Sequence, residues 1–130
     1  MRVLFTFFFA LFFCTGYAFP ETTAKIEVNT IDLDDDQDDL EDAIESALSY
    51  IRKALNSSTL SDIQYYARKA KNYASDAEDI ADDLEMDDVE DYCYKAYKYA
   101  RAAESETSID TAIDYLYTAR KALQNAYNEL

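Results

Sequence analysis

The chain has 130 residues, enough for one domain, and its 27 acidic against 12 basic side chains give a net charge of −15. Such an excess of carboxylates disfavours nucleic acid and anionic membrane surfaces as partners, because both attract Lys and Arg. The sequence also contains no His, which removes the commonest general base and a common metal ligand. We therefore expect a protein that is not an enzyme and whose charged partners are cationic.

Residues 1–18 have the pattern of an export signal. Arg2 supplies a short positive segment, an apolar run follows, and Gly16 and Ala18 place small residues where a signal peptidase cuts. The apolar run is shorter than the roughly 20 residues that span a bilayer. We expect cleavage after Ala18, a periplasmic or secreted protein, and no membrane association after cleavage. A lipoprotein anchored through Cys14 is the alternative.

The part that follows the signal is poor in turn-forming residues. The only Gly lies in the signal and the only Pro is Pro20, which argues against a turn-rich β fold and favours long helices. We expect 19–36 to be an acidic N-terminal segment and 37–130 to be the folded domain. Cys93 is the one Cys beyond the signal, so no intrachain disulfide can form there, and we expect a buried thiol of structural role.

Four stretches of the domain carry apolar residues at alternating steps of three and four, which lines one face of a helix. The polar stretches 56–58 and 105–107 are short loops, and short loops make neighbouring helices antiparallel. We therefore expect an all-α, up-down-up-down antiparallel four-helix bundle, with helices near 37–56, 60–85, 88–104 and 109–130. The predicted core positions are Leu40, Ile44, Ala47, Ile51, Ala54, Leu60, Ile63, Ala67, Ala70, Ala74, Ala77, Ala81, Leu84, Val89, Cys93, Ala96, Ala100, Ala103, Ala112, Leu116, Ala119, Leu123, Ala126 and Leu130.

Residue pairs spaced by three at the predicted helix starts resemble capping boxes, in which side chains bond the free N–H groups of the first turn. These pairs are Thr59 with Asp62, Asp87 with Glu90, and Thr107 with Asp110.

The domain contains an internal duplication, so each half is expected to be one helical hairpin. A solenoid of 34-residue repeats is the alternative, but the Gly and Pro signatures of such repeats are missing and two hairpins are too few to stack. Five residues of the first half recur in the second half at an offset of 49 residues. They are Asp42, Ala47, Tyr50, Arg52 and Ala54, which match Asp91, Ala96, Tyr99, Arg101 and Ala103. A three-residue insertion in a predicted loop then raises the offset to 52. Seven further residues recur at this offset: Asp62, Tyr65, Ala67, Arg68, Lys69, Ala70 and Ala74 match Asp114, Tyr117, Ala119, Arg120, Lys121, Ala122 and Ala126.

This layout of Ala-periodic, duplicated hairpins resembles small exported bacterial helix-hairpin proteins, including a histidine-rich metal-binding type. The resemblance covers 19–130 and implies a periplasmic four-helix protein. Because this sequence has Tyr where that type carries His, no ligand residue is carried over.

The tyrosines and arginines each allow a structural interpretation. Clustered tyrosines such as Tyr66 and Tyr73 would fill the edge of an Ala-rich core with their hydroxyls in water. The alternative is a Tyr-lined groove for a small ligand, such as a sugar or a peptide. One arginine per helix would cover Ala faces with its stem and pair with carboxylates. These are Arg52, Arg68, Arg101 and Arg120.

Two acidic runs are the most informative feature for function. Residues 32–42 hold eight carboxylates in eleven residues, and residues 76–91 hold ten in sixteen with no Lys or Arg. In an up-down-up-down bundle both runs meet at one end, where the second helix also presents acidic residues to its own negative dipole end. Our main hypothesis is an exported binding module that engages a cationic protein or another cationic ligand through this end.

Low-affinity binding of Ca²⁺ or another cation is the first alternative, and no cofactor besides Ca²⁺ is expected. Asp34, Asp36, Asp38 and Glu45 match positions 1, 3, 5 and 12 of an EF-hand loop, although position 6 is Asp39 and not Gly. The Tyr-lined small-ligand site is the second alternative. The candidate cation-binding residues are Asp34, Asp36, Asp38, Asp79, Asp82, Asp83, Asp87 and Asp88.

Overall fold

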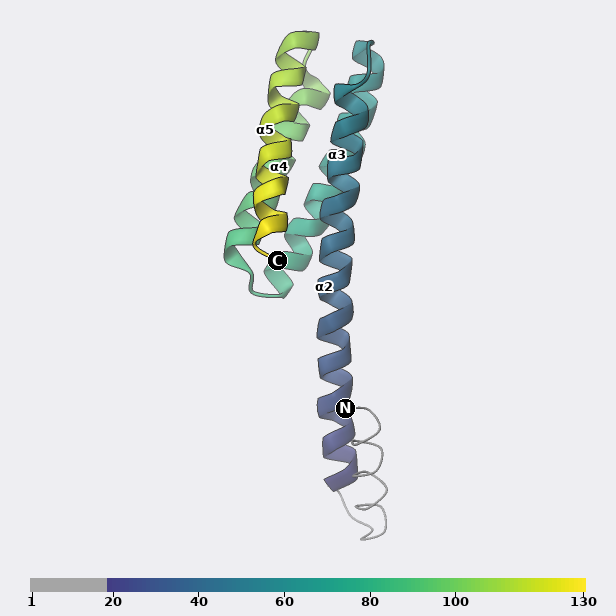
Figure 1. Ribbon diagram of the computed structural model, residues 1–130, viewed down its shortest axis with the longest axis vertical. Coiled ribbons are helices and arrows are strands. Elements are labelled where there is room, and N and C mark those ends of the chain that lie inside the picture. The colour runs from purple at the N-terminus through teal and green to yellow at the C-terminus, as the bar shows by residue number, and fades with distance from the viewer. Residues whose placement is uncertain (1–18) are drawn as a thin grey trace. The chain divides into compact units, whose positions relative to one another are not determined.

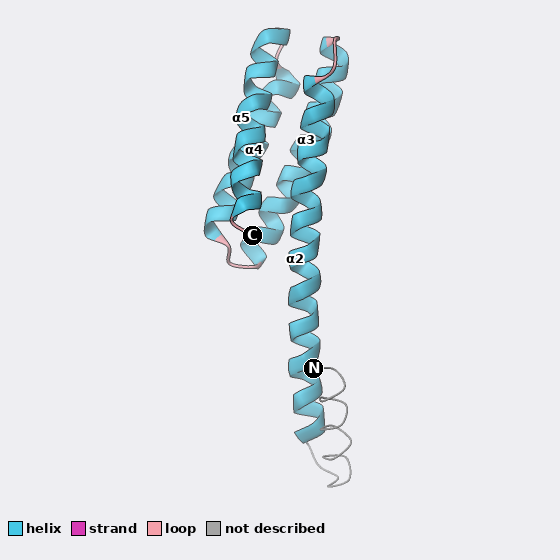
Figure 2. Cartoon of the chain, viewed as in Figure 1, coloured by secondary structure: helices cyan, strands magenta, loops and turns pink. Residues whose placement is uncertain are grey.

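The computed structural model describes residues 19–130, with side chains from residue 34 onward, and the export signal predicted for 1–18 lies outside this range. The described residues form helices joined by short loops, with no strand among them (Figures 1 and 2). This confirms the all-α class and the helical bundle. The helices are α2 (Phe19–Leu55), α3 (Leu60–Asp83), α4 (Asp87–Ser105) and α5 (Ile109–Asn128).

The first helix starts much earlier than the sequence suggested. The start expected near residue 37 was wrong, because α2 begins at Phe19. Pro20 lies in the first turn, where its missing N–H costs no helical hydrogen bond, and no Gly or further Pro interrupts the helix before Leu55. By its internal contacts the chain divides into a unit that ends at Asp35 and a second unit, Asp36–Leu130, which contains the bundle.

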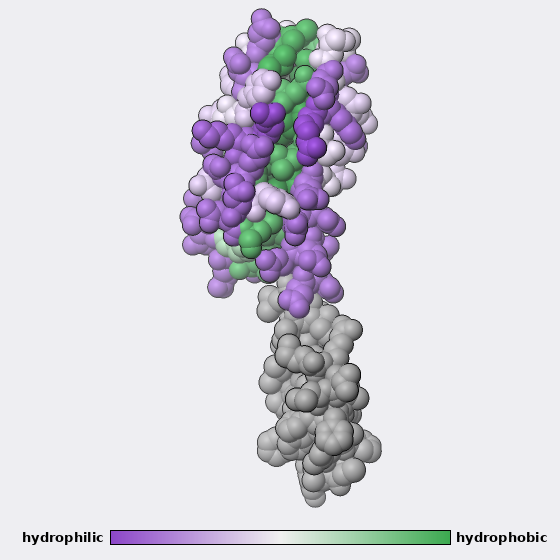
Figure 3. Space-filling view, in the orientation of Figure 1, coloured by the Kyte–Doolittle hydropathy of each residue, from purple (hydrophilic) through white to green (hydrophobic). Residues whose placement is uncertain are grey.

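The core of the second unit is entirely apolar. Of the 24 predicted core positions, all are buried except Leu60, Leu84 and Leu130, which are half-buried, and the structure adds Ala43 and Ala122. Apart from Ile63, the buried residues of α3 are all alanines. Such small side chains let helices approach closely. Figure 3 shows a stripe of hydrophobic residues along the near face of the bundle, flanked on both sides by hydrophilic side chains.

Each helix packs on its neighbours in the chain, and contacts between α2 and α5 close the bundle. α3 packs along α4, and α4 along α5, whereas α3 and α5 are diagonal (Figure 1). The ring of Tyr50 on α2 stacks on Tyr66 and Tyr73 of α3. The hydroxyl of Tyr127 near the end of α5 donates to Glu41 Oε1 of α2 at 3.0 Å. The expected up-down-up-down order is therefore present.

The cap predicted at Thr59 is confirmed, because the N–H of Asp62 donates to Thr59 Oγ1 at 3.2 Å. The box predicted at Asp87 was wrong, since α4 has Met86 as its N-cap with no side-chain cap bond. The physical reason lies in the preceding turn. Glu85 adopts a left-handed φ of 56°, and the Met86 N–H donates back to the Ala81 carbonyl at 2.9 Å. Because this tight turn joins the end of α3 directly to the start of α4, no side chain before Asp87 caps the N–H groups of the first turn of α4.

The last helix begins at Ile109 as predicted, but its N-cap lies one residue later than expected. Ser108 caps α5 by accepting from the Thr111 N–H at 3.5 Å, and Thr107 does not. The Glu106 carboxylate accepts from the N–H groups of Thr107 and Ser108 at 2.9 and 3.2 Å, which fixes the loop and leaves Ser108 to begin the helix.

Candidate functional site

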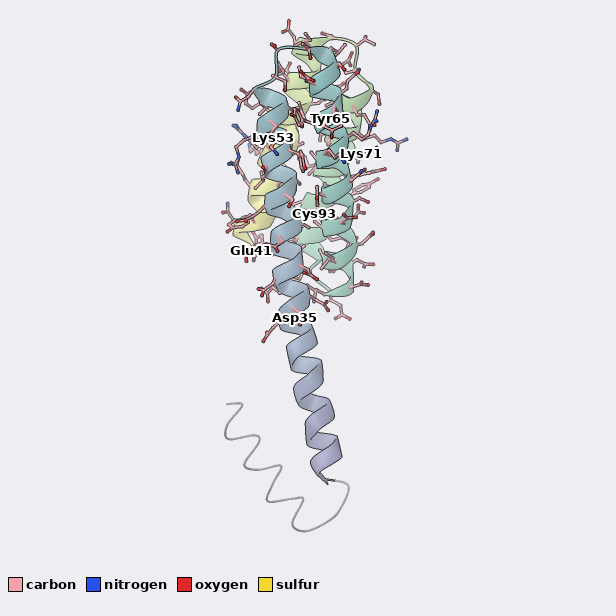
Figure 4. All side chains as sticks on the ribbon, turned by 90° about the vertical axis from the view of Figure 1, so that its right-hand side faces the viewer. Asp35, Glu41, Lys53, Tyr65, Lys71 and Cys93 are labelled. Carbon is pink, nitrogen blue, oxygen red and sulfur yellow. The ribbon has the colours of Figure 1, made fainter. Side chains whose placement is uncertain are left out.

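Carboxylates from three helices, and one that follows the fourth, gather at one end of the bundle, which we call the acidic pole. They are those of 36–45 on α2, those of 76–91 on α3 and α4, and Glu129 after α5. Several observations join these segments. Glu41 accepts the hydrogen bond from Tyr127, and Glu129 lines a common hollow with the start of α4. Figure 4 shows Glu41 towards this end of the bundle, and Lys53 and Tyr65 towards the other.

Like charges on α3 and α4 face each other at the pole. Burial raises the pKa of Glu78, and the charges of Asp79, Glu90 and Asp82 raise it further. Partial desolvation likewise raises the pKa of Glu90, with Asp82 among the charges that add to it. Two acidic helix ends are thus held together although their carboxylates repel.

A surface hollow of about 370 Å³ lies within the pole. Met86 and Val89 give it an apolar part, and four carboxylates surround that part. A hollow of this kind matches a long basic side chain, whose aliphatic stem packs on apolar surface while its charged head stays among carboxylates. The four acidic residues of the lining are Glu85, Asp87, Asp88 and Glu129.

The predicted cation-binding residues are spread over α2, α3 and α4. All eight are exposed, and Asp34 belongs to the unit that ends at Asp35. Of the others, Asp87 and Asp88 line the hollow, and Asp82 acts electrostatically on Glu78 and Glu90. Asp36 and Asp38 lie on α2, and Asp79 and Asp83 on α3.

The EF-hand match is contradicted, because residues 34–45 are continuous helix and cannot wrap around an ion as that loop does. Among the side chains that the structure describes, no group of three or more Cys, Asp or Glu is placed to hold a metal ion.

Tyr127 is a member of the pole that sequence reasoning missed. Its hydrogen bond to Glu41 raises the pKa of the phenol, and the charges of Glu41 and Glu45 add to this. This hydrogen bond links the last turn of α5 to α2. The spacing of acidic residues along the sequence does not predict that Tyr127 lies beside them.

The opposite half of the same α3–α4 contact is attractive. The carboxylate of Glu104 accepts from Arg68 Nε at 2.8 Å and from Lys71 Nζ at 2.6 Å. Burial alone would raise the pKa of Glu104, but the hydrogen bonds and charges of Lys71 and Arg68 lower it overall. The side-chain amide of Gln64 adds a bond of 2.9 Å to the Glu106 carbonyl.

Only part of the arginine hypothesis is confirmed. Arg68 pairs with Glu104 as expected, whereas Arg120 lies over the ring of Tyr117 at 5.0 Å. Arg52 and Arg101 are exposed near the ends of their helices.

Tyrosines form a continuous row between α2 and α3. Tyr65 meets Tyr66 edge-on at 5.3 Å, and Tyr50 stacks between Tyr66 at 6.3 Å and Tyr73 at 5.6 Å. Tyr50, Tyr66 and Tyr73 are partly buried against the core, as expected for rings that fill the edge of an Ala-rich interior.

Cys93 is fully buried on α4, as predicted. Burial, and secondarily the charge of Glu78, raises the pKa of its thiol to about 12. The thiol is therefore unreactive in the folded protein, since the thiolate is the nucleophile.

A scan against protein-family models found no match, and neither did searches of curated proteins and of solved structures. Among the helices of residues 19–130, none has the length and apolar character needed to cross a membrane.

Proposed function

We propose that this protein is an exported, non-enzymatic binding module that holds a Lys- or Arg-bearing segment of another protein at its acidic pole. The observation that carries the proposal is the hollow of about 370 Å³, in which Met86 and Val89 lie among four carboxylates. A basic side chain satisfies both parts of this lining, whereas a bare cation would use only the carboxylates.

The charge distribution supports the same partner. The chain places no Lys or Arg in 36–51, 72–94 or 122–130, so the segments that form the pole contain no cation of their own. Burial raises the pKa of Glu78 and of Glu90, and repulsion from neighbouring carboxylates raises both further. A cationic partner relieves this repulsion, and its binding is steered by the field of the pole.

The test is a titration of the protein, residues 19–130, into a fluorescently labelled ten-residue polylysine peptide, followed by fluorescence anisotropy. The triple variant Asp82→Asn, Asp83→Asn, Asp87→Asn should bind about tenfold more weakly, at about 0.5 kcal/mol for each charge removed.

The matched control removes three exposed carboxylates far from the pole: Asp62→Asn, Asp110→Asn, Asp114→Asn. It has the same net charge as the pole variant and should bind nearly as the unmodified protein does. Equal weakening in both triple variants would show that net charge alone attracts the peptide, and would overturn the proposal.

Thermal unfolding separates this function from cation binding. Millimolar CaCl₂ and NaCl of equal ionic strength should raise Tm equally if the ions only screen the pole. A larger rise in Ca²⁺, lost in the pole variant, would favour the Ca²⁺-binding alternative, because a ligand that binds the folded state stabilises it.

A further inference from the structure

A second hollow, of about 410 Å³, lies between α4 and α5 and differs in character from the one at the pole. It contains no carboxylate, although the chain as a whole carries a net charge of −15. Its lining includes Tyr92 and Lys95 from α4, and Tyr117, Thr118, Lys121 and Asn125 from α5.

The internal duplication shows what occupies the equivalent place in the other hairpin. At the offset of 52 residues, Thr118 and Asn125 stand where α3 has Tyr66 and Tyr73. Those two rings stack on Tyr50 at centroid distances of 6.3 and 5.6 Å and pack against the core. The second hairpin has a Thr and an Asn in place of two phenol rings, and its hollow lies at these positions.

The rim of this hollow carries two ammonium groups. Lys95 and Lys121 are both exposed, and in the described part of the chain neither forms an ion pair or lies over an aromatic ring. In the first hairpin the counterpart of Lys95, at the offset of 49, is Ser46. The second hairpin has therefore gained a cation in the groove where it lacks the rings.

We propose that this groove between α4 and α5 binds a small organic anion that carries a flat ring, of the class of aromatic carboxylates. The ring takes the place of the missing phenol side chains, beside Tyr92 and Tyr117, because aromatic rings favour offset and edge-on contacts with one another. The carboxylate lies at the rim between Lys95 and Lys121, and the Asn125 amide can donate a hydrogen bond to a polar substituent. This site is independent of the acidic pole and of its proposed cationic partner.

The probe that tests this site is 4-hydroxyphenylacetate, which joins a phenol ring like that of tyrosine to a carboxylate. Added to the ¹⁵N-labelled protein, residues 19–130, it should shift backbone amide signals of α4 and α5 around the groove. The dissociation constant should be in the millimolar range expected of so small a ligand in an open groove.

Two variants test the two halves of the argument. Thr118→Tyr with Asn125→Tyr rebuilds the filling seen in the first hairpin, and it should abolish the shifts. Lys121→Gln should weaken binding about fivefold, as for the loss of one surface charge pair. Lys69→Gln is the matched control, because Lys69 occupies the same repeat position in α3, and it should leave the affinity unchanged.

Two simpler compounds supply the outcomes that would overturn the proposal. If acetate shifts the same signals with equal affinity, the groove binds any anion and the ring has no role. If 4-methylphenol binds as well as 4-hydroxyphenylacetate, the lysines have no role. Absence of shifts with 4-hydroxyphenylacetate, or shifts that persist unchanged in the Thr118→Tyr, Asn125→Tyr variant, would equally show that the site is not in this groove.

Discussion

The contact between α3 and α4 is attractive near one end and repulsive near the other. Towards the loop between α4 and α5, Arg68 and Lys71 share the carboxylate of Glu104, and its pKa falls. Towards the pole, burial and the charges of neighbouring carboxylates raise the pKa of both Glu78 and Glu90. The same two helices thus meet under opposite electrostatic conditions.

This difference shows which interaction determines the fold. If ion pairs governed the packing, the α3 and α4 ends at the pole would separate. They remain together because a continuous apolar face, from Ile63 to Ala81 on α3 and from Val89 to Ala103 on α4, is buried along the whole contact. The apolar face therefore holds the pole carboxylates close together, where a partner can use them.

The change that should disturb this contact most is Ala70→Leu. Ala70 is fully buried on α3, between the two residues that pair with Glu104. Extra methyl and methylene groups there should overpack the contact and lower the free energy of unfolding by about 1–3 kcal/mol. Urea denaturation measures this, with Asn72→Leu on the exposed side of α3 as a control expected to change it by less than about 0.5 kcal/mol. An unchanged midpoint for Ala70→Leu would mean that the helices are not closely packed there.

Removal of the shared carboxylate should have the next largest effect. Glu104→Gln removes the negative charge and one of the two acceptor oxygens that Arg68 and Lys71 use. Because the Glu104 side chain is only 17% exposed, we expect a loss of about 1 kcal/mol at neutral pH. Since folding lowers the pKa of Glu104, its contribution is present above the ordinary value of 4.5 and is lost as the pH falls through the lowered folded value. Denaturation curves of variant and unmodified protein should therefore converge in acid. A difference that persists at the lowest pH would point to lost packing and not to charge.

The smallest of the three effects should come from the repulsive end and have the opposite sign. Glu78→Gln removes a charge that Asp79, Glu90 and Asp82 disfavour, so Tm at neutral pH should rise slightly. Folding raises the pKa of Glu78, so the protonated side chain contributes stability at pH values below its ordinary pKa of 4.5. This contribution is lost as the pH rises through the raised pKa of the folded state. The gain in Tm should accordingly shrink as the pH falls. Asp114→Asn, an exposed change on α5, is the control, and an equal gain there would implicate net charge instead of the pole.

Most of the fold could be predicted from the sequence, because helix periodicity and core packing depend on local spacing. The alanine positions from Ala67 to Ala81 were correctly placed in the core for this reason. The start of α2 at Phe19 was not, although Pro20 is typical of a first turn, because the apolar spacing of three and four begins only at Leu40. Met86 was missed as an N-cap because the tight turn at Glu85 uses a left-handed φ without a glycine to signal it.

The sites were less predictable, because they depend on how helices are rotated against one another. The acidic pole followed from topology alone. The sharing of Glu104 between Arg68 and Lys71 did not, since residues more than thirty positions apart meet only after packing. A signal for the α4–α5 groove was present in the sequence, because Thr118 and Asn125 stand where the first repeat has Tyr66 and Tyr73.

The buried thiol of Cys93 can be used to measure local opening of the bundle. Cys93 is the one thiol in residues 19–130, it lies on the α3–α4 contact, and its pKa of about 12 leaves almost no thiolate at neutral pH. An alkylating reagent can therefore modify it only in molecules in which α4 has transiently separated from the core. The labelling rate, divided by that of the unfolded chain, gives the fraction of time the contact is open, so local opening can be timed without any added probe.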